Sequence, residues 1–100
     1  MSIISEVLRE ELERNIAMQK SYQDEILSLP RGTMILKKIS NRDYYYLLYR
    51  DQGKVTTSYL GAAKKVDVNA MQKQIARRRY FQDSLKKLKI EEKEIRKAIG

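Results

Sequence analysis

Apolar residues recur every three or four positions through the first 29 residues of the chain. They are Ile4, Val7 or Leu8, Leu12, Ile16, Tyr22, Ile26 and Leu29. This spacing places apolar side chains on one side of an α-helix, with mainly charged and amide side chains between them. Ser2 or Ser5 suits the N-cap, and Pro30 disfavours helix at the preceding residue. The pattern predicts one long helix over residues 1–29, ending near Ser28.

Residues 30–61 change in character, because β-branched and aromatic residues alternate with turn-forming clusters. This composition predicts a three-stranded antiparallel β-meander. Its second turn, Arg50-Asp51-Gln52-Gly53-Lys54, has glycine at the third loop position, which is typical of a three-residue loop closed by a G1 bulge. Such a loop pairs three residues of the second strand with three of the third: Tyr49 with Val55, Leu47 with Thr57 and Tyr45 with Tyr59. All six side chains are then expected on one face of the sheet.

The first turn, around Ser40-Asn41-Arg42-Asp43, is expected to contain two or four loop residues, which places Met34 and Leu36 on that same face. An odd loop length would exchange the two faces of the first strand. The shared face is expected to be the core side. The opposite face then carries tyrosines, cations and hydroxyl groups.

A second helix is predicted over residues 66–99, with Asp67 or Asn69 as its cap. Its apolar stripe comprises Met71, Ile75, Leu85, Leu88, Ile95 and Ile99. Arg78 and Glu92 interrupt this stripe where a continuous seam would have apolar residues. The elements together predict an α+β fold of one domain over residues 1–100, with the two helices forming an antiparallel hairpin.

Composition narrows the chemistry that the chain can carry. There is no His and no Cys among the 100 residues, which removes disulfides, an imidazole base, a thiol nucleophile and the usual ligands of zinc and haem. We therefore expect neither an enzyme nor a bound metal or cofactor. The apolar runs are shorter than the roughly 20 residues that span a bilayer, so no membrane association is expected. The absence of Cys is compatible with a cytoplasmic location.

The net charge of +8 is distributed unevenly. Residues 1–29 carry three basic and six acidic side chains, a net of −3, whereas residues 30–65 carry eight and two, a net of +6. Residues 66–100 carry ten and five, a net of +5. Pairing between the acidic first segment and the basic last one would neutralise part of this asymmetry, but the middle segment stays positive.

Two sets of residues are candidates for binding nucleic acid. The first is the tyrosine and cation face of the meander, where rings stack on bases and cations meet phosphates. The second is the basic part of the last helix. The candidates are Arg31, Lys37, Arg42, Tyr44, Tyr46, Arg50 and Lys54 in the meander, and Lys73, Arg77, Arg78, Arg79 and Lys86 in the helix. Alternatively, the tyrosines are there as good strand formers and the cations of the strands prevent edge pairing. The cations of the helix would then form a solvated face and pair with Glu10, Glu11 and Glu13.

The motifs Leu29-Pro30-Arg31-Gly32, Tyr44-Tyr45-Tyr46-Leu47, Gly53-Lys54-Val55 and Tyr59-Leu60-Gly61 follow one another in the meander. This pattern resembles small proteins and modules of Gram-positive bacteria and their mobile elements. It is loosely similar to the N-terminal meanders of some transposases and to the arm-binding domain of phage integrases. The resemblance covers about residues 29–61. It implies a phage or mobile-element context, in which small basic proteins bind nucleic acid or inhibit host machinery.

The leading hypothesis is therefore a small, basic, non-catalytic protein that binds DNA or RNA. The runner-up is a protein-binding adaptor or inhibitor, similar to an anti-CRISPR protein, that docks on a host nuclease or its ribonucleoprotein complex. A positive charge argues against mimicry of DNA, which needs an acidic surface. A homodimer formed through the long helices is a third possibility.

Overall fold

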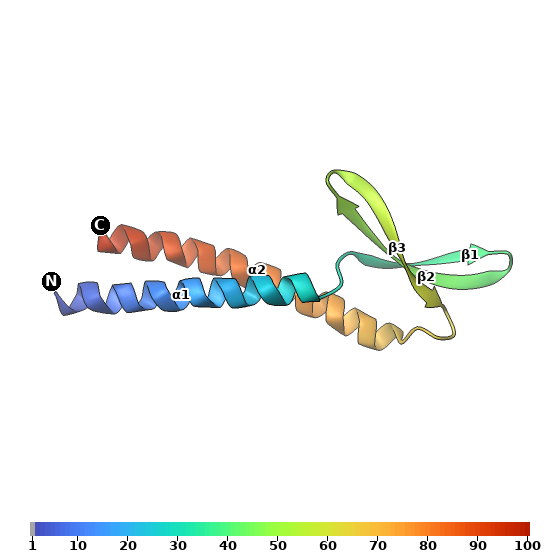
Figure 1. The fold of residues 1–100 in the computed structure, drawn as a ribbon, viewed down its shortest axis with the longest axis horizontal. Coiled ribbons are helices and arrows are strands. Elements are labelled where there is room, and N and C mark those ends of the chain that lie inside the picture. The colour runs from blue at the N-terminus through green and yellow to red at the C-terminus, as the bar shows by residue number, and fades with distance from the viewer. Residues whose placement is uncertain (1) are drawn as a thin grey trace. The chain divides into compact units, whose positions relative to one another are not determined.

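The computed structural model describes residues 2–100 and contains two helices and three strands (Figure 1). In chain order these are α1 (Ile3–Ser28), β1 (Thr33–Ile39), β2 (Arg42–Asp51), β3 (Lys54–Ala62) and α2 (Val68–Ile99). The predicted α+β fold is confirmed. The chain divides into two units, one with α1 and the part of α2 from Arg79 onward, and the other with Leu29–Arg78.

The helices begin and end where local chemistry favours it. Ser2 Oγ accepts a hydrogen bond from the Ser5 amide at 3.2 Å, and Asp67 Oδ1 accepts one from the Ala70 amide at 3.0 Å. Each side chain satisfies an amide that has no partner within its own helix. Of the two caps predicted as alternatives for each helix, Ser2 and Asp67 are thus the ones used. α1 ends at Ser28, two residues before Pro30, as predicted.

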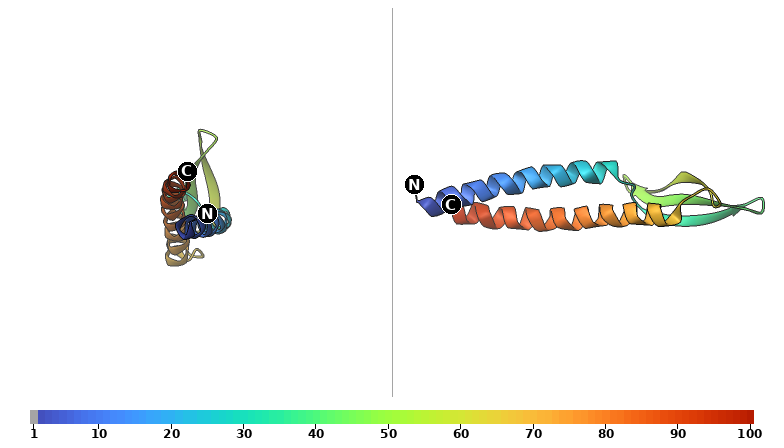
Figure 2. Two further views of the ribbon diagram at one scale, coloured as in Figure 1. Left: turned by 90° about the vertical axis from the view of Figure 1, so that its left-hand side faces the viewer. Right: turned by 90° about the horizontal axis from the view of Figure 1, so that it is seen from below.

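In the first unit, α1 and the C-terminal part of α2 run antiparallel, side by side, with the start of α1 and the end of α2 at the same end of the pair (Figure 2). Phe81, Leu88 and Ile95 of α2 are buried, and the Phe81 ring lies 5.1 Å from that of Tyr22. Most of the partly or fully buried positions of α1 follow steps of four and three residues: Leu8, Leu12, Asn15, Gln19, Tyr22 and Ile26. This is the seam spacing of paired helices.

Two apolar residues predicted for the α1 stripe lie outside this seam. Ile4 is 72% exposed and Ile16 is 44% exposed, whereas the neighbouring Asn15 is only 2% exposed. The prediction was wrong at these positions because it followed hydrophobicity, while the pairing of two helices selects positions by a seven-residue repeat. A polar residue consequently occupies a buried place in the seam.

Hydrogen bonds satisfy the polar residues of this seam. Asn15 Nδ2 donates to the Leu88 carbonyl at 2.9 Å, and Gln19 Nε2 lies 2.7 Å from both Asn15 Oδ1 and Glu92 Oε1. Arg96 Nε donates to Glu92 Oε2 at 2.7 Å. The bond from Gln19, followed by that from Arg96, lowers the pKa of the Glu92 carboxyl. The interruption predicted at Glu92 is thus one member of a hydrogen-bonded network.

The sheet has the strand order β1-β2-β3, and both pairs are antiparallel. Ile39 pairs with Arg42 across the two-residue loop Ser40-Asn41, whose φ angles are 51° and 65°. Two positive φ angles are the mark of a type I′ turn. The even loop length was predicted, and the register follows from it: Met34 lies opposite Leu47, which is buried.

The second hairpin differs from the prediction. Asp51 pairs with Lys54, so the loop contains two residues, Gln52 and Gly53, with φ angles of 50° and 79°. Glycine in a left-handed conformation fits both loop types, but the type I′ turn better matches the twist of the strands. The register therefore moves by one residue, and every side chain of β3 near this turn changes face. The face that carries Tyr44 and Tyr46 therefore does not include the predicted Lys54, Thr56 and Ser58. It includes Val55, Thr57 and Tyr59 instead.

Two local features shape the meander. Tyr46 pairs with Tyr59 and Tyr45 with Gly61, so that Leu60 is an additional residue and forms a β-bulge. Gly32 has a φ of 102°, and a Cβ at this position would lie 2.3 Å from the Leu48 carbonyl oxygen. Only glycine allows the entry segment to approach the backbone of β2 so closely.

Candidate functional site

Three tyrosines gather on one face of the sheet and are called here the tyrosine cluster: Tyr44, Tyr46 and Tyr59. The Tyr59 ring lies 6.2 Å from the Tyr44 ring and 5.5 Å from the Tyr46 ring, in tilted and edge-on arrangements typical of aromatic pairs. Tyr59 is 59% exposed and the other two are half-buried. Sequence reasoning placed Tyr44 and Tyr46 together but missed Tyr59, because the three-residue loop put it on the other face.

Cations border the tyrosine cluster. Lys37 Nζ lies 4.7 Å from the centre of the Tyr46 ring, close enough for a cation–π contact. Arg42 and Arg50, near the two ends of β2, share this face by strand alternation, and both are exposed. The structure therefore brings Lys37 and Arg50 to the face of the tyrosines, as predicted, and adds Arg42, which was expected at its margin.

Two predicted cations lie elsewhere in the meander. The Arg31 guanidinium stacks 4.4 Å above the Tyr49 ring and lies 3.5 Å from Asp51 Oδ1. Tyr49 and Asp51 belong to the face opposite the tyrosine cluster, and Lys54 pairs with Asp51 on that face. Arg31 and Lys54 are therefore separated from the cluster by the sheet.

Arg78 has a structural contact of its own. Its Nη1 donates a hydrogen bond to the Leu29 carbonyl at 2.7 Å, just beyond the end of α1, where helix carbonyls lack partners. Burial, and then the nearby charge of Arg31, lower the pKa of the Arg78 guanidinium from its usual value. The arginine remains protonated at neutral pH. On the same stretch of α2, Lys73 and Arg77 are exposed.

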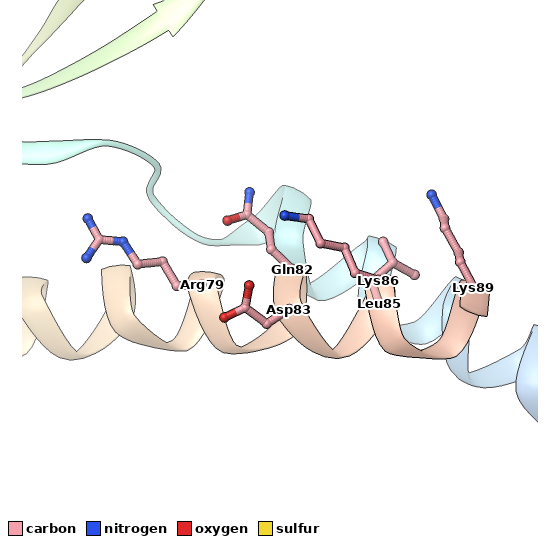
Figure 3. Close-up of a pocket in the computed structure, with 6 residues that line it drawn as sticks. All are labelled: Arg79, Gln82, Asp83, Leu85, Lys86 and Lys89. Carbon is pink, nitrogen blue, oxygen red and sulfur yellow. The ribbon is translucent and has the colours of Figure 1, made fainter. Parts of the chain in front are cut away.

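The first unit has an open groove along α2, called here the basic groove, with a volume of about 440 Å³. It is lined by Arg79, Gln82, Asp83, Leu85, Lys86 and Lys89 (Figure 3). Arg79, Gln82, Lys86 and Lys89 recur at steps of three and four residues, so they extend from one side of the helix. The structure thus joins the predicted Arg79 and Lys86. It adds Lys89, which belongs to the same basic stretch of sequence but was not predicted as a site residue.

The second unit has a hollow of about 560 Å³ at the end of the sheet where β1 turns into β2, called here the turn hollow. It is lined by Asn41, Arg42, Asp43, Tyr44, Ala62, Ala63, Lys64 and Lys65. Tyr44 pairs with Ala62, which brings the loop after β3 beside the first turn. Lys64 and Lys65 were missed as site residues. Their signal in the sequence was a lysine pair one residue after the last strand.

Two other features, a metal site and a membrane-spanning helix, are not found among the described residues. Within residues 2–100, no group of three or more Asp and Glu side chains is placed to hold a metal ion. In the same range, neither helix contains an apolar stretch of the length that a membrane span requires.

The chain matches one protein family, described as "Domain of unknown function (DUF6788)", over residues 2–70. The matched range includes α1, the whole meander and the first residues of α2. No curated protein and no solved structure matches the chain.

Proposed function

We propose that this chain, which belongs to the DUF6788 family, is a small non-catalytic nucleic-acid-binding protein. The tyrosine cluster and its neighbouring cations make the principal contact. The exposed cations of the basic groove add contacts to phosphates. The protein is expected to act in the cytoplasm, and a phage or mobile-element context stays a prediction from the resemblance of the meander motifs.

The observation that carries the proposal is the combination of rings and cations on one sheet face. Aromatic rings stack on bases of any identity, and lysine and arginine side chains meet the backbone phosphates. Tyr59 offers an exposed ring, while Lys37, Arg42 and Arg50 surround the cluster with positive charge. A surface that serves only to prevent edge pairing has no need for a tyrosine ring in contact with two others.

Charge supports the same proposal. The net charge of +8 favours association with a polyanion over distances of about a Debye length. In the basic groove, Arg79, Lys86 and Lys89 outnumber the single carboxylate of Asp83. Such contacts to phosphates are independent of sequence, so they contribute affinity rather than specificity.

A binding panel tests the proposal. Duplex DNA, single-stranded DNA, duplex RNA and single-stranded RNA are titrated with the full chain at two salt concentrations. We expect binding to at least one of these ligands, with log K falling linearly as log salt rises, because each neutralised phosphate releases counterions. Affinity that does not change with salt, or no binding to any of the four, contradicts the proposal.

One observation favours the alternative of a protein partner. Ile39 and Val55 lie on the face of the tyrosine cluster and are 48% and 61% exposed. Exposed apolar side chains beside tyrosines are typical of protein interfaces. An adaptor or inhibitor that docks on a host nuclease or ribonucleoprotein would use this face, and a nuclease-treated pulldown with a stoichiometric partner would favour it. The homodimer stays a separate prediction, which light scattering of the purified protein tests.

A further inference from the structure

The turn hollow is lined by three cations that form no ion pair with the described side chains near them. Arg42, Lys64 and Lys65 line it, and within residues 2–100 no ion pair holds any of the three. Asp43 also lines the hollow, but strand alternation directs its side chain toward the face opposite Tyr44. The three cations therefore outnumber Asp43, the one carboxylate among the residues that line the hollow.

Small side chains and main-chain hydrogen bonds characterise the loop that carries two of these cations. Ala62 and Ala63 have small side chains, which leave room in the hollow. The Ala63 amide donates to the Asp43 carbonyl at 2.9 Å, and the Lys65 and Val66 amides donate to the Ala62 carbonyl at 2.9 and 3.2 Å. These hydrogen bonds hold the loop of the two lysines against the start of β2, so the main chain that carries both lysines has a defined position.

Tyr44 connects the hollow to the tyrosine cluster. It lines the hollow, and its ring also lies 6.2 Å from the ring of Tyr59. A base on the exposed ring of Tyr59 would therefore have its own backbone beside Arg42, Lys64 and Lys65. Base and phosphate contacts placed side by side match one nucleotide unit of a strand.

We propose that the turn hollow binds a backbone phosphate of single-stranded nucleic acid while the adjacent base stacks on the tyrosine cluster. This inference rests on the proposed function and specifies its ligand. The faces of bases inside a duplex are covered by their neighbours, so a stacking platform accepts unpaired bases only. Because an unpaired base is required beside the phosphate, a duplex is excluded as the ligand of the turn hollow and the tyrosine cluster together.

The test compares two double variants of the full chain that remove the same charge. Lys64→Gln/Lys65→Gln alters the turn hollow. Lys38→Gln/Lys54→Gln alters the opposite face of the same sheet, where both side chains lie by register. Far-UV circular dichroism and thermal unfolding first establish that both fold. The probes are an oligothymidylate and an oligouridylate of about 12 nucleotides, within the range that single-strand binders cover, and a duplex DNA of equal length.

We expect the wild-type chain to bind at least one single strand more tightly than the duplex. The hollow variant should bind that strand about tenfold more weakly, and its salt slope should fall by about 0.7 for each phosphate that the protein no longer neutralises. The opposite-face variant should change affinity less than about threefold, through general charge alone.

The outcomes separate this inference from the proposed function. If nucleic acid binds but the two double variants behave alike, the hollow is not a phosphate site, and the proposed function stands. If the duplex binds as tightly as the single strands, the single-strand inference is overturned, and the proposed function again stands. If no probe binds, this inference fails, and the proposed function fails with it when duplex RNA does not bind either.

Discussion

The side-chain amide of Asn15 donates a hydrogen bond to the main-chain carbonyl of Leu88 across the seam between α1 and α2, at 2.9 Å. Asn15 is 2% exposed, which makes it the sole polar residue classed as buried within residues 2–100. A buried polar residue in a helical seam costs stability but favours one alignment of the helices over others. The seam of the hairpin is therefore specified by a hydrogen bond as well as by packing.

Two substitutions at Asn15 should distinguish its effect on the free energy of unfolding from its effect on the alignment of the two helices. Asn15→Ala leaves Gln19 without one of its acceptors and is expected to lower the free energy of unfolding by about 1–3 kcal/mol, measured by urea denaturation. Gln23→Ala, at an exposed position of α1, is the matched control and should change it by less than about 0.5 kcal/mol. Asn15→Leu should instead raise the unfolding temperature and yield additional oligomers in light scattering. A more stable Ala variant would contradict this role.

The stability of the hairpin should depend on pH through Glu92. Its carboxylate accepts bonds from Gln19 and Arg96, which lower its pKa below the usual 4.5. A lowered pKa in the folded state means that the stabilisation is complete above the usual value and is lost as the pH falls through the lowered one. The difference in unfolding temperature between wild type and Glu92→Gln should therefore shrink on acidification below about pH 4.5. Glu94→Gln, exposed on the same helix, is the control for the loss of charge, and equal pH profiles for both variants would exclude the effect.

Gly32 should be intolerant of any side chain. Gly32→Ala adds a Cβ that would lie 2.3 Å from the Leu48 oxygen, at a φ of 102°. We expect a loss of at least about 3 kcal/mol, because steric overlap adds to backbone strain. Gly53→Ala has a positive φ of 79° but no atom within 4 Å of the new Cβ, so strain alone should cost about 1 kcal/mol. Chemical denaturation followed by tyrosine fluorescence measures both, and an equal loss in the two variants would show that the close approach is unimportant.

The tyrosine cluster should carry base stacking. Tyr59→Leu keeps an apolar side chain on β3 but removes the exposed ring. Stacking of about 1–3 kcal/mol for each base predicts roughly 5- to 150-fold weaker binding of single-stranded nucleic acid. Tyr80→Leu removes a ring of α2 that is 62% exposed and is not a member of the cluster. Fluorescence anisotropy with a labelled oligonucleotide compares the two, and equal affinities would argue against stacking on Tyr59.

The basic groove should contribute affinity without preference for sequence. Lys86→Gln/Lys89→Gln is expected to weaken duplex binding and to reduce the salt slope by about 0.9 for each phosphate left without its cation. Lys20→Gln/Lys87→Gln removes the same charge from positions that do not line the groove. Its slope should stay close to that of the wild type. A wild-type slope in the groove variant would show that Lys86 and Lys89 do not meet phosphates.

Much of the local structure could be predicted because it depends on a few neighbouring residues. Pro30 ended α1, Ser2 and Asp67 capped the helices, and Ser40-Asn41 gave the first hairpin an even loop. The second hairpin was wrong because the same glycine serves both a two-residue and a three-residue loop. The difference lies in the φ of Gln52, which is 50°, and no residue type in that turn dictates it.

The candidate site depended on this single choice. One residue of register brought Tyr59 to Tyr44 and Tyr46 and moved Lys54 to the other face. Sequence reasoning found the type of surface and several of its members, namely Lys37, Arg42, Arg50 and two of the tyrosines. It missed Lys64 and Lys65, because only the pairing of Tyr44 with Ala62 brings their loop beside the first turn.

The sequence by itself determined two long helices, a three-stranded meander and their ends, because backbone sterics and hydrophobic periodicity act over a few residues. It also determined the uneven positive charge, which follows from a count of charged residues. Only the tertiary structure decided which polar residue is buried between the helices and which tyrosines share a face. Asn15 is buried rather than Ile16, since the seam of paired helices follows a seven-residue repeat. Tyr59 joins the cluster, since the turn at Gln52 and Gly53 has two residues rather than three, a choice that glycine alone leaves open and that moves the register of β3 by one residue.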